Sequence, residues 1–521
     1  MTKQSFIKGT LILLAAGIIN RILGFIPRMT LPRVIGSEGI GLYQMGWPFL
    51  VVILTLVTGG IPVAVAKLIA AAEAEGSEAR IRSIFRVSLA LSTVLGLFFG
   101  AAIFYFAPWI TSHVFTDSRV YYTFLCMTPI VPIVAVSSVF RGYFQGRHNM
   151  IPTALSQVIE TLIRIVTVLL FAYWMIPYGI EYAAAGAMVG VTIGEIGAML
   201  VLAIISLRGR QSRPEKPRAE IGRRKPLNRL ANLKNLLSLA VPITGSKLVG
   251  SGSYLLESIL TVHALAAAGL ATGVATAQYG ALQGMIIPVL LLPSALTFSL
   301  AVSLVPSLSE AAARGDMKTI HMRLHQSLKL ALVTGAPFAV LMYVLAEPIC
   351  LYMYNQPGVG AMLRMMAPAA LFIYLQAPLQ SALQALERPG SALVNTLVGS
   401  VVKLALIVML ASRPEFGILG AVVAITVNIM LVTVLHWNSM VRLLQFRMEV
   451  SDFVKVGFSM AAAGVSSYSV MYSGWLPDGF GKFASACFTG FVIYLLAATL
   501  LRLIDRDDLF RIFWLGKKFV K

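Results

Sequence analysis

The sequence predicts an all-α integral membrane protein with about fourteen transmembrane helices. The chain of 521 residues is 58% hydrophobic and only 12% charged, whereas soluble domains are about one quarter charged. Its mean hydropathy is +0.81. The apolar runs are long enough to cross a bilayer as helices and show no alternating pattern, so a helical bundle is expected rather than a barrel.

The first apolar run begins close to the N-terminus and is expected to remain as a helix, because no small-residue cleavage site follows a short apolar core. Prolines inside several runs predict the broken helices that transporters often contain. The fourteen expected spans are 7–29, 42–68, 84–107, 120–140, 153–176, 182–206, 236–262, 276–301, 327–346, 361–385, 392–411, 419–441, 453–472 and 482–501.

Basic residues set the expected orientation of these spans. With the N-terminus inside, the inner segments carry 31 Lys and Arg residues and the outer connections carry five. Such a bias predicts a multi-pass protein of the cell membrane with both termini in the cytoplasm. The basic stretch 208–234 is expected to be a flexible linker. Its charges either determine topology or contact the lipid surface.

A weak internal repeat predicts the domain organisation. Shifted by 238 residues, Pro177–Ile180 aligns with Glu415–Ile418 and keeps its Gly-Ile pair in register. Parallel repeats are common in transporters, with the substrate bound between them. We therefore expect two pseudo-symmetric six-helix lobes around a central cavity. The expected boundaries are an N-terminal lobe at 1–207, a basic cytoplasmic linker at 208–235, a C-terminal lobe at 236–441, and two further helices with a cytoplasmic tail at 442–521.

Charged residues within or at the ends of the apolar spans are the candidate functional site. A charge in hydrocarbon is costly, so such residues usually face a bundle interior or a hydrated cavity. Five cations against three carboxylates predict a cavity that receives an anion. These residues are Arg21, Arg28, Arg164, Lys247 and Lys403, and Glu160, Glu195 and Glu257.

Two arginines of the first span are the strongest candidates for contact with the substrate. Arg21 and Arg28 are seven residues apart, which is two helical turns, so both point the same way. The planar donor fork of arginine suits a diphosphate or a carboxylate. Because Arg28 lies at the end of its span, it could instead extend to the outer surface.

The seventh span carries a polar stripe. Lys247, Ser251, Tyr254 and Ser258 recur at helical spacing, with Glu257 beside them. The stripe predicts the lining of a hydrated cavity, with hydrogen bonding between helices as the alternative. Glu257 is also a candidate proton or cation site.

The polar residues of three other spans each allow two interpretations. Glu160 and Arg164 are four residues apart and predict a local ion pair, with cavity lining as the alternative. Polar stripes in spans ten and eleven predict either a hydrophilic path or contacts that join helices. The stripes are Gln376, Gln380 and Gln384, and Asn395, Gly399 and Lys403.

Several classes of function are not indicated. The net charge of +20 could indicate nucleic acid, but the basic residues lie in the connections between spans. No catalytic set, metal-ligand spacing or ATP-binding loop occurs. His321 and His325 are expected on a solvated helix face. We therefore expect no enzyme activity, no cofactor and no nucleic-acid partner, with coupling to an unidentified ion left open.

Several stretches resemble the stage V sporulation protein B family, within the multidrug/oligosaccharidyl-lipid/polysaccharide exporter superfamily. They are KGTLILLAAGIINRILGF (8–25), FRGYFQGRHNMIPTALSQVIE (140–160), YGIEYAAAGAM (178–188), LTFSLAVSLVPSLSEA (296–311) and PLQSALQAL (378–386). The resemblance covers essentially the whole chain. It implies fourteen helices in two lobes, and the pattern from Arg21 to Arg28 resembles the first helix of the lipid II flippase in this superfamily.

The resemblance implies a flippase for an undecaprenyl-diphosphate-linked cell-wall precursor. Lipid II for spore cortex peptidoglycan is the expected substrate, moved from the inner to the outer leaflet by alternating access. Expected partners are this lipid-linked substrate, membrane lipids and wall synthases, in a membrane that surrounds the forespore. A cation-coupled multidrug exporter and a non-transporting scaffold for wall synthesis are the alternatives. Glu257 matches one acid of a sodium site found in some relatives, whereas span eleven carries Asn395 in place of the second acid.

Overall fold

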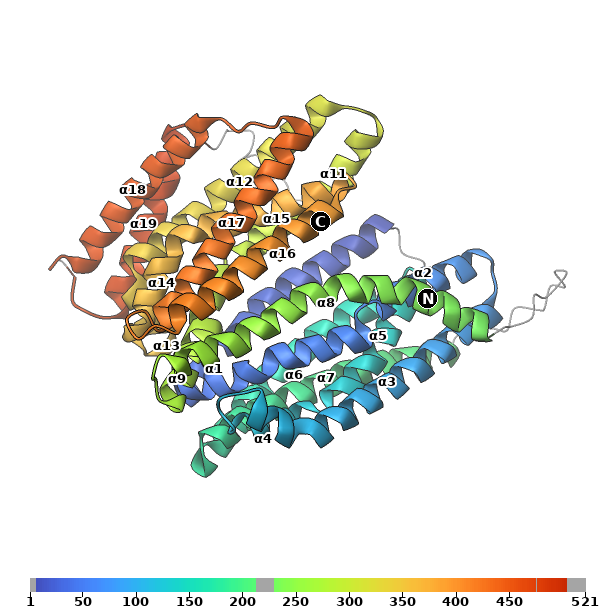
Figure 1. The fold of residues 1–521 in the computed structure, drawn as a ribbon. Helices are drawn as coiled ribbons and strands as arrows, with labels where there is room; N and C mark the ends of the chain where they lie inside the picture. The colour runs from blue at the N-terminus through green and yellow to red at the C-terminus, as the bar shows by residue number, and fades with distance from the viewer. Residues whose placement is uncertain (1–5, 212–228, 475, 504–521) are drawn as a thin grey trace. The chain divides into compact units, whose positions relative to one another are not determined.

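The structure is a computed structural model that describes residues 6–211, 229–474 and 476–503. Within these ranges every regular element is a helix (Figure 1). The α-helices are α1 (Phe6–Thr58), α2 (Ile61–Ala74), α3 (Glu78–His113), α4 (Val120–Met127), α5 (Ile130–Gly146), α6 (Ile151–Met175), α7 (Ile180–Gln211), α8 (Arg229–Ala267), α9 (Thr272–Gly280), α10 (Ile287–Leu291), α11 (Ser294–Ala313), α12 (Met317–Val344), α13 (Ala346–Tyr354), α14 (Gly360–Met366), α15 (Ala370–Ala385), α16 (Pro389–Leu406), α17 (Ile418–Leu444), α18 (Val450–Tyr472) and α19 (Phe480–Leu500).

Short helical segments of other types join several of these helices. The 3₁₀ segments are η1 (Ile176–Tyr178), η3 (Pro357–Val359) and η4 (Ala367–Ala369). The π segments are η2 (Ala281–Ile286) and η5 (Ile407–Ala411). Each is a place where the regular hydrogen-bond ladder changes. The prolines within the apolar runs predict two of these changes, because η4 contains Pro368 and η2 ends just before Pro288, whereas η5 contains no proline.

The described helices confirm the predicted fold class of a helical membrane protein. Twelve helical segments in the described residues are long and apolar enough to cross a membrane. One of them, Ala15–Ala74, covers two expected spans, because the chain stays helical on either side of Gly36. Helix α18 covers the expected span 453–472. All fourteen expected spans thus lie on helices.

The expected breaks between spans are less accurate than the spans themselves. The first two spans merge because only Gly36 departs from helical geometry, with φ 67° and ψ −177°. The expected connection between spans eight and nine is also largely helical, since α11 ends at Ala313 and α12 begins at Met317. Helices extend into polar sequence when neighbours or water satisfy their ends, so hydropathy marks the spans but not the full helices. The expected linker 208–235 is helical at both ends, and 212–228 lie outside the described residues.

The described residues form two compact units. The first comprises Met1–Met285 and Ser412–Ile418, and the second comprises Ile286–Ala411 and Leu419–Lys521. Helices α8 and α9 belong to the first unit because they pack against α1, and α8 also packs against α2 and α3. The predicted lobes, with a boundary after residue 207, stay a prediction about internal symmetry.

In the first unit α1 is the central element. It packs against α6, α7, α8 and α9, while α6 and α7 lie along each other (Figure 1). Closely approaching backbones allow this packing. A Cβ atom added to Gly190 of α7 would lie 2.4 Å from the backbone nitrogen of Val168 in α6. Small residues at such contacts let membrane helices pack tightly.

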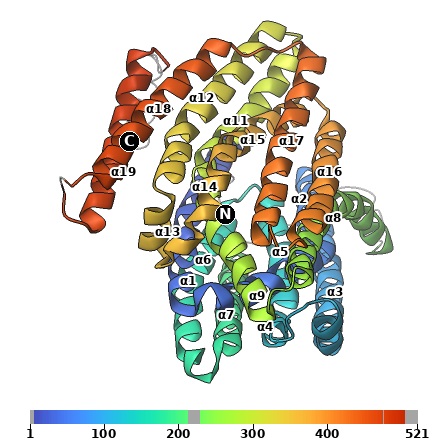
Figure 2. The same cartoon turned by 60° about the vertical axis from the view of Figure 1, so that its left-hand side comes forward.

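In the second unit α12 and α15 contribute half of the buried residues of the core cluster. Their buried side chains form one cluster with residues of α11, α17, α18 and α19. Helices α18 and α19 are a pair beside α12, as Figure 2 shows. The buried Tyr494 of α19 donates a hydrogen bond to the carbonyl of Val333 in α12 at 2.8 Å. This contact ties the C-terminal helix pair to the rest of the unit.

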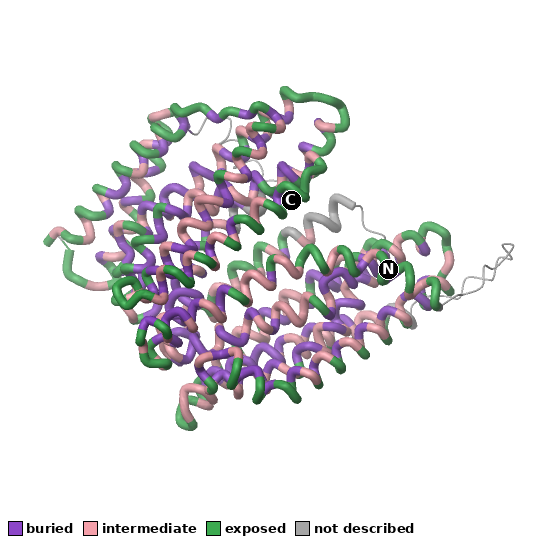
Figure 3. The backbone as a smooth tube through the Cα atoms, viewed as in Figure 1, coloured by how far each residue is buried: buried purple, intermediate pink, exposed green. Residues whose placement is uncertain are grey.

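The burial pattern is that of a protein whose solvent is lipid. Buried and exposed residues alternate along the helices of both units (Figure 3). On α6, Val166 is 63% exposed and Leu170 is 58% exposed, whereas the polar Ser156 and Glu160 are buried. An apolar outer face with polar groups turned inward is expected within a bilayer.

Candidate functional site

Arg21 and Arg28 lie on α1, two turns apart, and both side chains are exposed. The two guanidinium groups are close enough to repel each other. Because like charges destabilise each other, a bound anion would stabilise this pair. The structure therefore places both residues as the sequence predicts, on one helix and within electrostatic reach of each other.

Arg28 also lies near groups from two other regions of the first unit. Tyr43, further along α1, interacts electrostatically with both Arg28 and Arg164 of α6. Tyr254 of α8 interacts with Arg28, Tyr43 and Glu257. Arg28 forms no ion pair with any residue that the structure describes. The arginine at the end of the first expected span thus lies within electrostatic reach of polar groups on α1 and α8, and both its predicted contact with the substrate and the alternative of extension to the surface stay predictions.

The polar stripe of α8 lies in the same unit. Lys247 is exposed, and its Nζ donates a hydrogen bond to the carbonyl of Gly59 at 2.7 Å. Tyr254 is partly buried two turns further on. This carbonyl lies between α1 and α2, so the Lys247 contact also joins helices. The structure brings Arg21, Arg28, Arg164, Lys247 and Tyr254 together in one unit, and we call these five residues the basic face.

Glu257 lies at the C-terminal end of this stripe and is only 7% exposed. Its Oε1 accepts a hydrogen bond of 2.7 Å from Nε2 of Gln283 in η2. Nearby, the buried hydroxyls of Ser258 and Tyr279 lie beside each other. This part of the first unit is therefore polar.

Glu160 and Arg164 form the predicted local ion pair, with Arg164 Nη1 3.2 Å from Glu160 Oε1. The structure adds a second cation. Arg141 of α5 places Nη2 2.9 Å from Glu160 Oε2, and the carboxylate is nearly buried. Glu195 of α7 also lies beside this group. The sequence analysis did not include Arg141 among the candidates, because it placed this residue in an inner connection. The ion pair with Glu160, 19 residues further on, joins α5 to α6.

Lys403 differs from the other predicted substrate-binding residues because it belongs to the second unit. It is buried on α16, with 7% exposure. Its predicted contact with the substrate stays a prediction. The neighbouring polar stripes join helices: Gln376 Nε2 donates to the carbonyl of Ile429 at 2.9 Å, and Asn395 Nδ2 donates to Ser439 Oγ at 2.9 Å. For these two residues the contacts favour helix joining over a hydrophilic path.

The first unit contains a second polar network, which the sequence analysis did not predict. Arg119 binds Asp117 through two hydrogen bonds, at 3.0 Å and 2.8 Å, and its Nη2 lies 2.7 Å from Glu38 Oε1. Thr276 of α9 donates to Asp117 Oδ2 at 2.8 Å. We call Glu38, Asp117, Arg119 and Thr276 the outer network. It connects α1, the segment before α4, and α9.

The outer network holds Asp117 in its charged form. Burial alone would raise the pKa of this carboxyl group, which is 2% exposed. Hydrogen bonds from Arg119 and Thr276, and the charge of Arg119, outweigh burial and lower its pKa below the usual 3.8. A buried carboxylate that is fully hydrogen-bonded stabilises the fold only while its partners remain.

Replacement of Arg119 by glutamine is expected to destabilise the protein by about 3 kcal/mol, because Asp117 would keep its buried charge and lose its main partner. Thermal unfolding of the purified protein in detergent measures this change. Arg364→Gln is the matched control. Arg364 pairs with Glu347 at 3.1 Å, but both side chains are exposed by 44% and 54%, so a change below about 1 kcal/mol is expected. Equal effects of the two substitutions would contradict the role of the outer network.

The stability contributed by Asp117 is expected to depend on pH. Its pKa is lower in the folded chain, so the unfolded chain binds more protons near pH 4. The contribution is present above the ordinary carboxyl pKa and disappears as pH falls through the lowered value. We expect the difference in Tm between the unsubstituted protein and Asp117→Asn to be largest at pH 6 and to shrink towards pH 3. A constant difference would show that the charge of Asp117 is not involved.

The segment RGYFQGR (141–147), at the C-terminal end of α5, packs against α2. Gly142 and Gly146 pack directly on the backbone of α2, where an added Cβ would lie 2.7 Å from a carbonyl oxygen in each case. Arg147 then binds Glu78 through Nη1 at 3.0 Å and Nη2 at 2.5 Å. The glycine spacing of this motif is explained by helix packing, and Arg147 fixes the turn between α2 and α3. Within the described residues, no group of three His, Cys, Asp or Glu side chains could hold a metal ion.

Comparison with known proteins decides the family. A family model described as polysaccharide biosynthesis protein matches residues 6–312, and a second model, MatE, matches residues 258–409. The chain is also 39% identical to stage V sporulation protein B of Bacillus subtilis (strain 168) over the full length of both proteins. The chain belongs to the polysaccharide biosynthesis protein family. The resemblance expected from the motifs is confirmed.

Two further comparisons cover most of the chain. The lipid II flippase MurJ of Bacillus subtilis is 24% identical over 81% of this chain and 80% of its own. A solved structure of a lipid II flippase MurJ in an inward closed conformation matches with a TM-score of 0.69 at 14% identity, over 95% of this chain and 98% of that one. The chain therefore has the fold of this flippase structure.

Proposed function

We propose that this protein is a flippase that moves an undecaprenyl-diphosphate-linked cell-wall precursor from the inner to the outer leaflet. The observation that carries the proposal is the basic face of the first unit, where Arg28 lies within electrostatic reach of Arg21 and of two tyrosines. Cationic donors of this kind suit a diphosphate better than a cationic drug. The cation-coupled exporter is therefore the weaker alternative.

The mechanism follows from the cost of moving a polar head group through hydrocarbon. A diphosphate-linked sugar would lose its water in the bilayer, and buried polar groups without partners are costly. Arg21, Arg28 and Lys247 would replace part of that water with fixed donors, while Tyr254 would donate to sugar hydroxyls. The lipid tail would remain among the acyl chains. Alternating access then exposes the head group to the other side. No covalent step is needed, so the proposed activity is not enzymatic.

Lipid II is the precursor we propose. The 24% identical relative is named a lipid II flippase, and the 39% identical relative is named for sporulation. We accordingly assign the substrate to the synthesis of spore cortex peptidoglycan in the membrane around the forespore. Wall synthases that use the flipped precursor are the proposed partners. Coupling to an ion stays a prediction, with the buried Glu257 as its candidate site.

Reconstituted vesicles that contain only this protein test the proposal. Fluorescent lipid II is placed in both leaflets, and a membrane-impermeant quencher reports the fraction that becomes accessible with time. We expect fast exposure of lipid II and slow exposure of a lipid-linked polymer of unrelated sugar. Equal rates with and without protein would exclude the flippase. If the protein is only a scaffold, depleting it from cells would also cause no accumulation of lipid II.

A further inference from the structure

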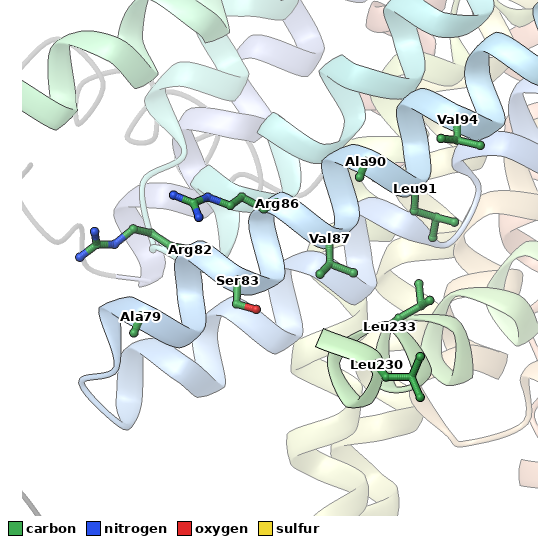
Figure 4. A pocket seen from close by; sticks show the side chains of 10 residues that line it. All are labelled: Ala79, Arg82, Ser83, Arg86, Val87, Ala90, Leu91, Val94, Leu230 and Leu233. Atoms are coloured by element: carbon green, nitrogen blue, oxygen red, sulfur yellow. The ribbon is translucent and has the colours of Figure 1, made fainter. Parts of the chain in front are cut away.

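A pocket on the first unit lies outside the basic face and is unused in the proposed transport. It has a volume of about 820 Å³ and lies between the first half of α3 and the start of α8 (Figure 4). This volume is in the range of small-molecule and lipid sites. One wall consists of α3 residues from Ala79 to Val94, and the other consists of Leu230 and Leu233 of α8.

The pocket is basic at one end and apolar along the rest. Arg82 and Arg86 are exposed and four residues apart, so they lie on one face of α3. Figure 4 shows their guanidinium groups extending in the same direction, away from Leu230 and Leu233. Neither arginine forms an ion pair in the part of the chain that the structure describes, and no acidic residue lines the pocket. The basic end is therefore complementary to an anion.

The apolar part is shorter than one membrane leaflet and would hold only part of an acyl chain. It runs from Val87 to Val94, which is about 10 Å along the helix axis, compared with about 15 Å for half of the hydrocarbon core. Leu230 is 75% exposed and Val94 is 64% exposed, so the apolar walls open towards lipid. Asn232 Nδ2 donates to Ser83 Oγ at 3.0 Å and holds α8 against α3 between the two walls.

We propose that this pocket binds an anionic phospholipid of the cytoplasmic leaflet. The lipid phosphate would contact Arg82 and Arg86, and the start of one acyl chain would lie against Val87, Leu91 and Leu233. The basic loops place this end of α3 on the cytoplasmic side. Leu230 and Leu233 lie near the C-terminal end of the predicted basic linker 208–235, and the negative surface potential of this leaflet would also attract the basic residues of that linker. The site is separate from the basic face and does not depend on the substrate that is transported.

Native mass spectrometry of the purified full-length protein tests the site with phosphatidylglycerol as the probe and phosphatidylethanolamine as the zwitterionic comparison. We expect the double substitution Arg82→Gln with Arg86→Gln to weaken phosphatidylglycerol binding by about tenfold. Binding of phosphatidylethanolamine is expected to stay unchanged. The matched control is Arg80→Gln on the same helix turn, because Arg80 donates to Glu75 at 2.5 Å and does not line the pocket.

A second variant keeps the charges and removes the space. Ala90 is exposed and lines the pocket, so Ala90→Trp should fill the apolar part without disturbing the core and should also weaken phosphatidylglycerol binding. Unchanged phosphatidylglycerol binding in both variants would overturn the proposal. Displacement of phosphatidylglycerol by equimolar lipid II would overturn it too, because the pocket would then belong to the substrate path.

Discussion

Replacing Arg28 with alanine is expected to reduce the rate of translocation by about 10- to 100-fold, since one charge-assisted contact to a diphosphate is worth about 1.5–3 kcal/mol. Arg28 of α1 interacts electrostatically with Arg21, Tyr43 and Tyr254. Its loss removes the centre of the basic face. Exchange of fluorescent lipid II in reconstituted vesicles measures the effect, at equal amounts of inserted protein.

Two further substitutions separate charge from geometry. Arg28→Lys keeps the charge but loses the planar fork of donors, so it should retain partial activity. Arg21→Ala should cause a loss comparable to that of Arg28→Ala. Arg364→Ala is the control, because this exposed arginine pairs with Glu347 in the second unit. Full activity of Arg28→Ala would remove the proposed contact with the anion.

Replacing Gly41 with alanine is expected to destabilise the protein by about 3 kcal/mol, the upper part of the range for overpacking. The added Cβ would lie 2.1 Å from the backbone oxygen of Thr276, so α1 and α9 would have to separate. Gly280 shows the same contact from the other side, where a Cβ would lie 2.2 Å from the carbonyl oxygen of Ser37. A backbone contact of this kind cannot be relieved by rotation of a side chain.

The effect of Gly41→Ala should spread to the outer network. Thr276 donates to the buried Asp117, so displacement of Thr276 also weakens that hydrogen bond. Thermal unfolding in detergent measures the loss of stability. Gly24→Ala on the same helix is the matched control, because a Cβ at Gly24 meets no atom within 4 Å, and alanine should be neutral or stabilise the helix by up to about 1 kcal/mol. Equal stability of the two variants would contradict the close contact of α1 and α9.

The helices could be predicted from the sequence because their signal is local. A run of about 20 apolar residues must form its backbone hydrogen bonds internally, whatever lies beside it. The pairing of Glu160 with Arg164 was predictable for the same reason, since four residues separate them on one helix. The expected connection between the first two spans, 30–41, was too long, because only Gly36 departs from helical geometry there. Polar residues are tolerated inside a membrane helix that packs against neighbours.

Contacts between distant segments were not predictable from one sequence. Arg141 reaches Glu160, and Thr276 reaches Asp117, through the packing of helices, and no local pattern encodes which helices meet. The cluster of Arg28 with Tyr43 and Tyr254 has the same origin. Charges inside apolar spans supplied the candidate residues, because burial of charge is costly. The residues that contact them could be identified only from the packing of the helices.

Accessibility of Arg28 to water tests the central claim most directly. In a variant without the three native cysteines, Arg28→Cys would be treated with a charged thiol reagent that reacts only in water. Gly358→Cys, in the 3₁₀ segment η3 where Gly358 is exposed, is the positive control, and Val166→Cys, on the apolar face of α6 where Val166 is 63% exposed, is the negative control. We predict rapid labelling of Arg28→Cys, slowed by lipid II, and no labelling of Val166→Cys. An unreactive Arg28→Cys beside a reactive Gly358→Cys would show that no hydrated basic face exists.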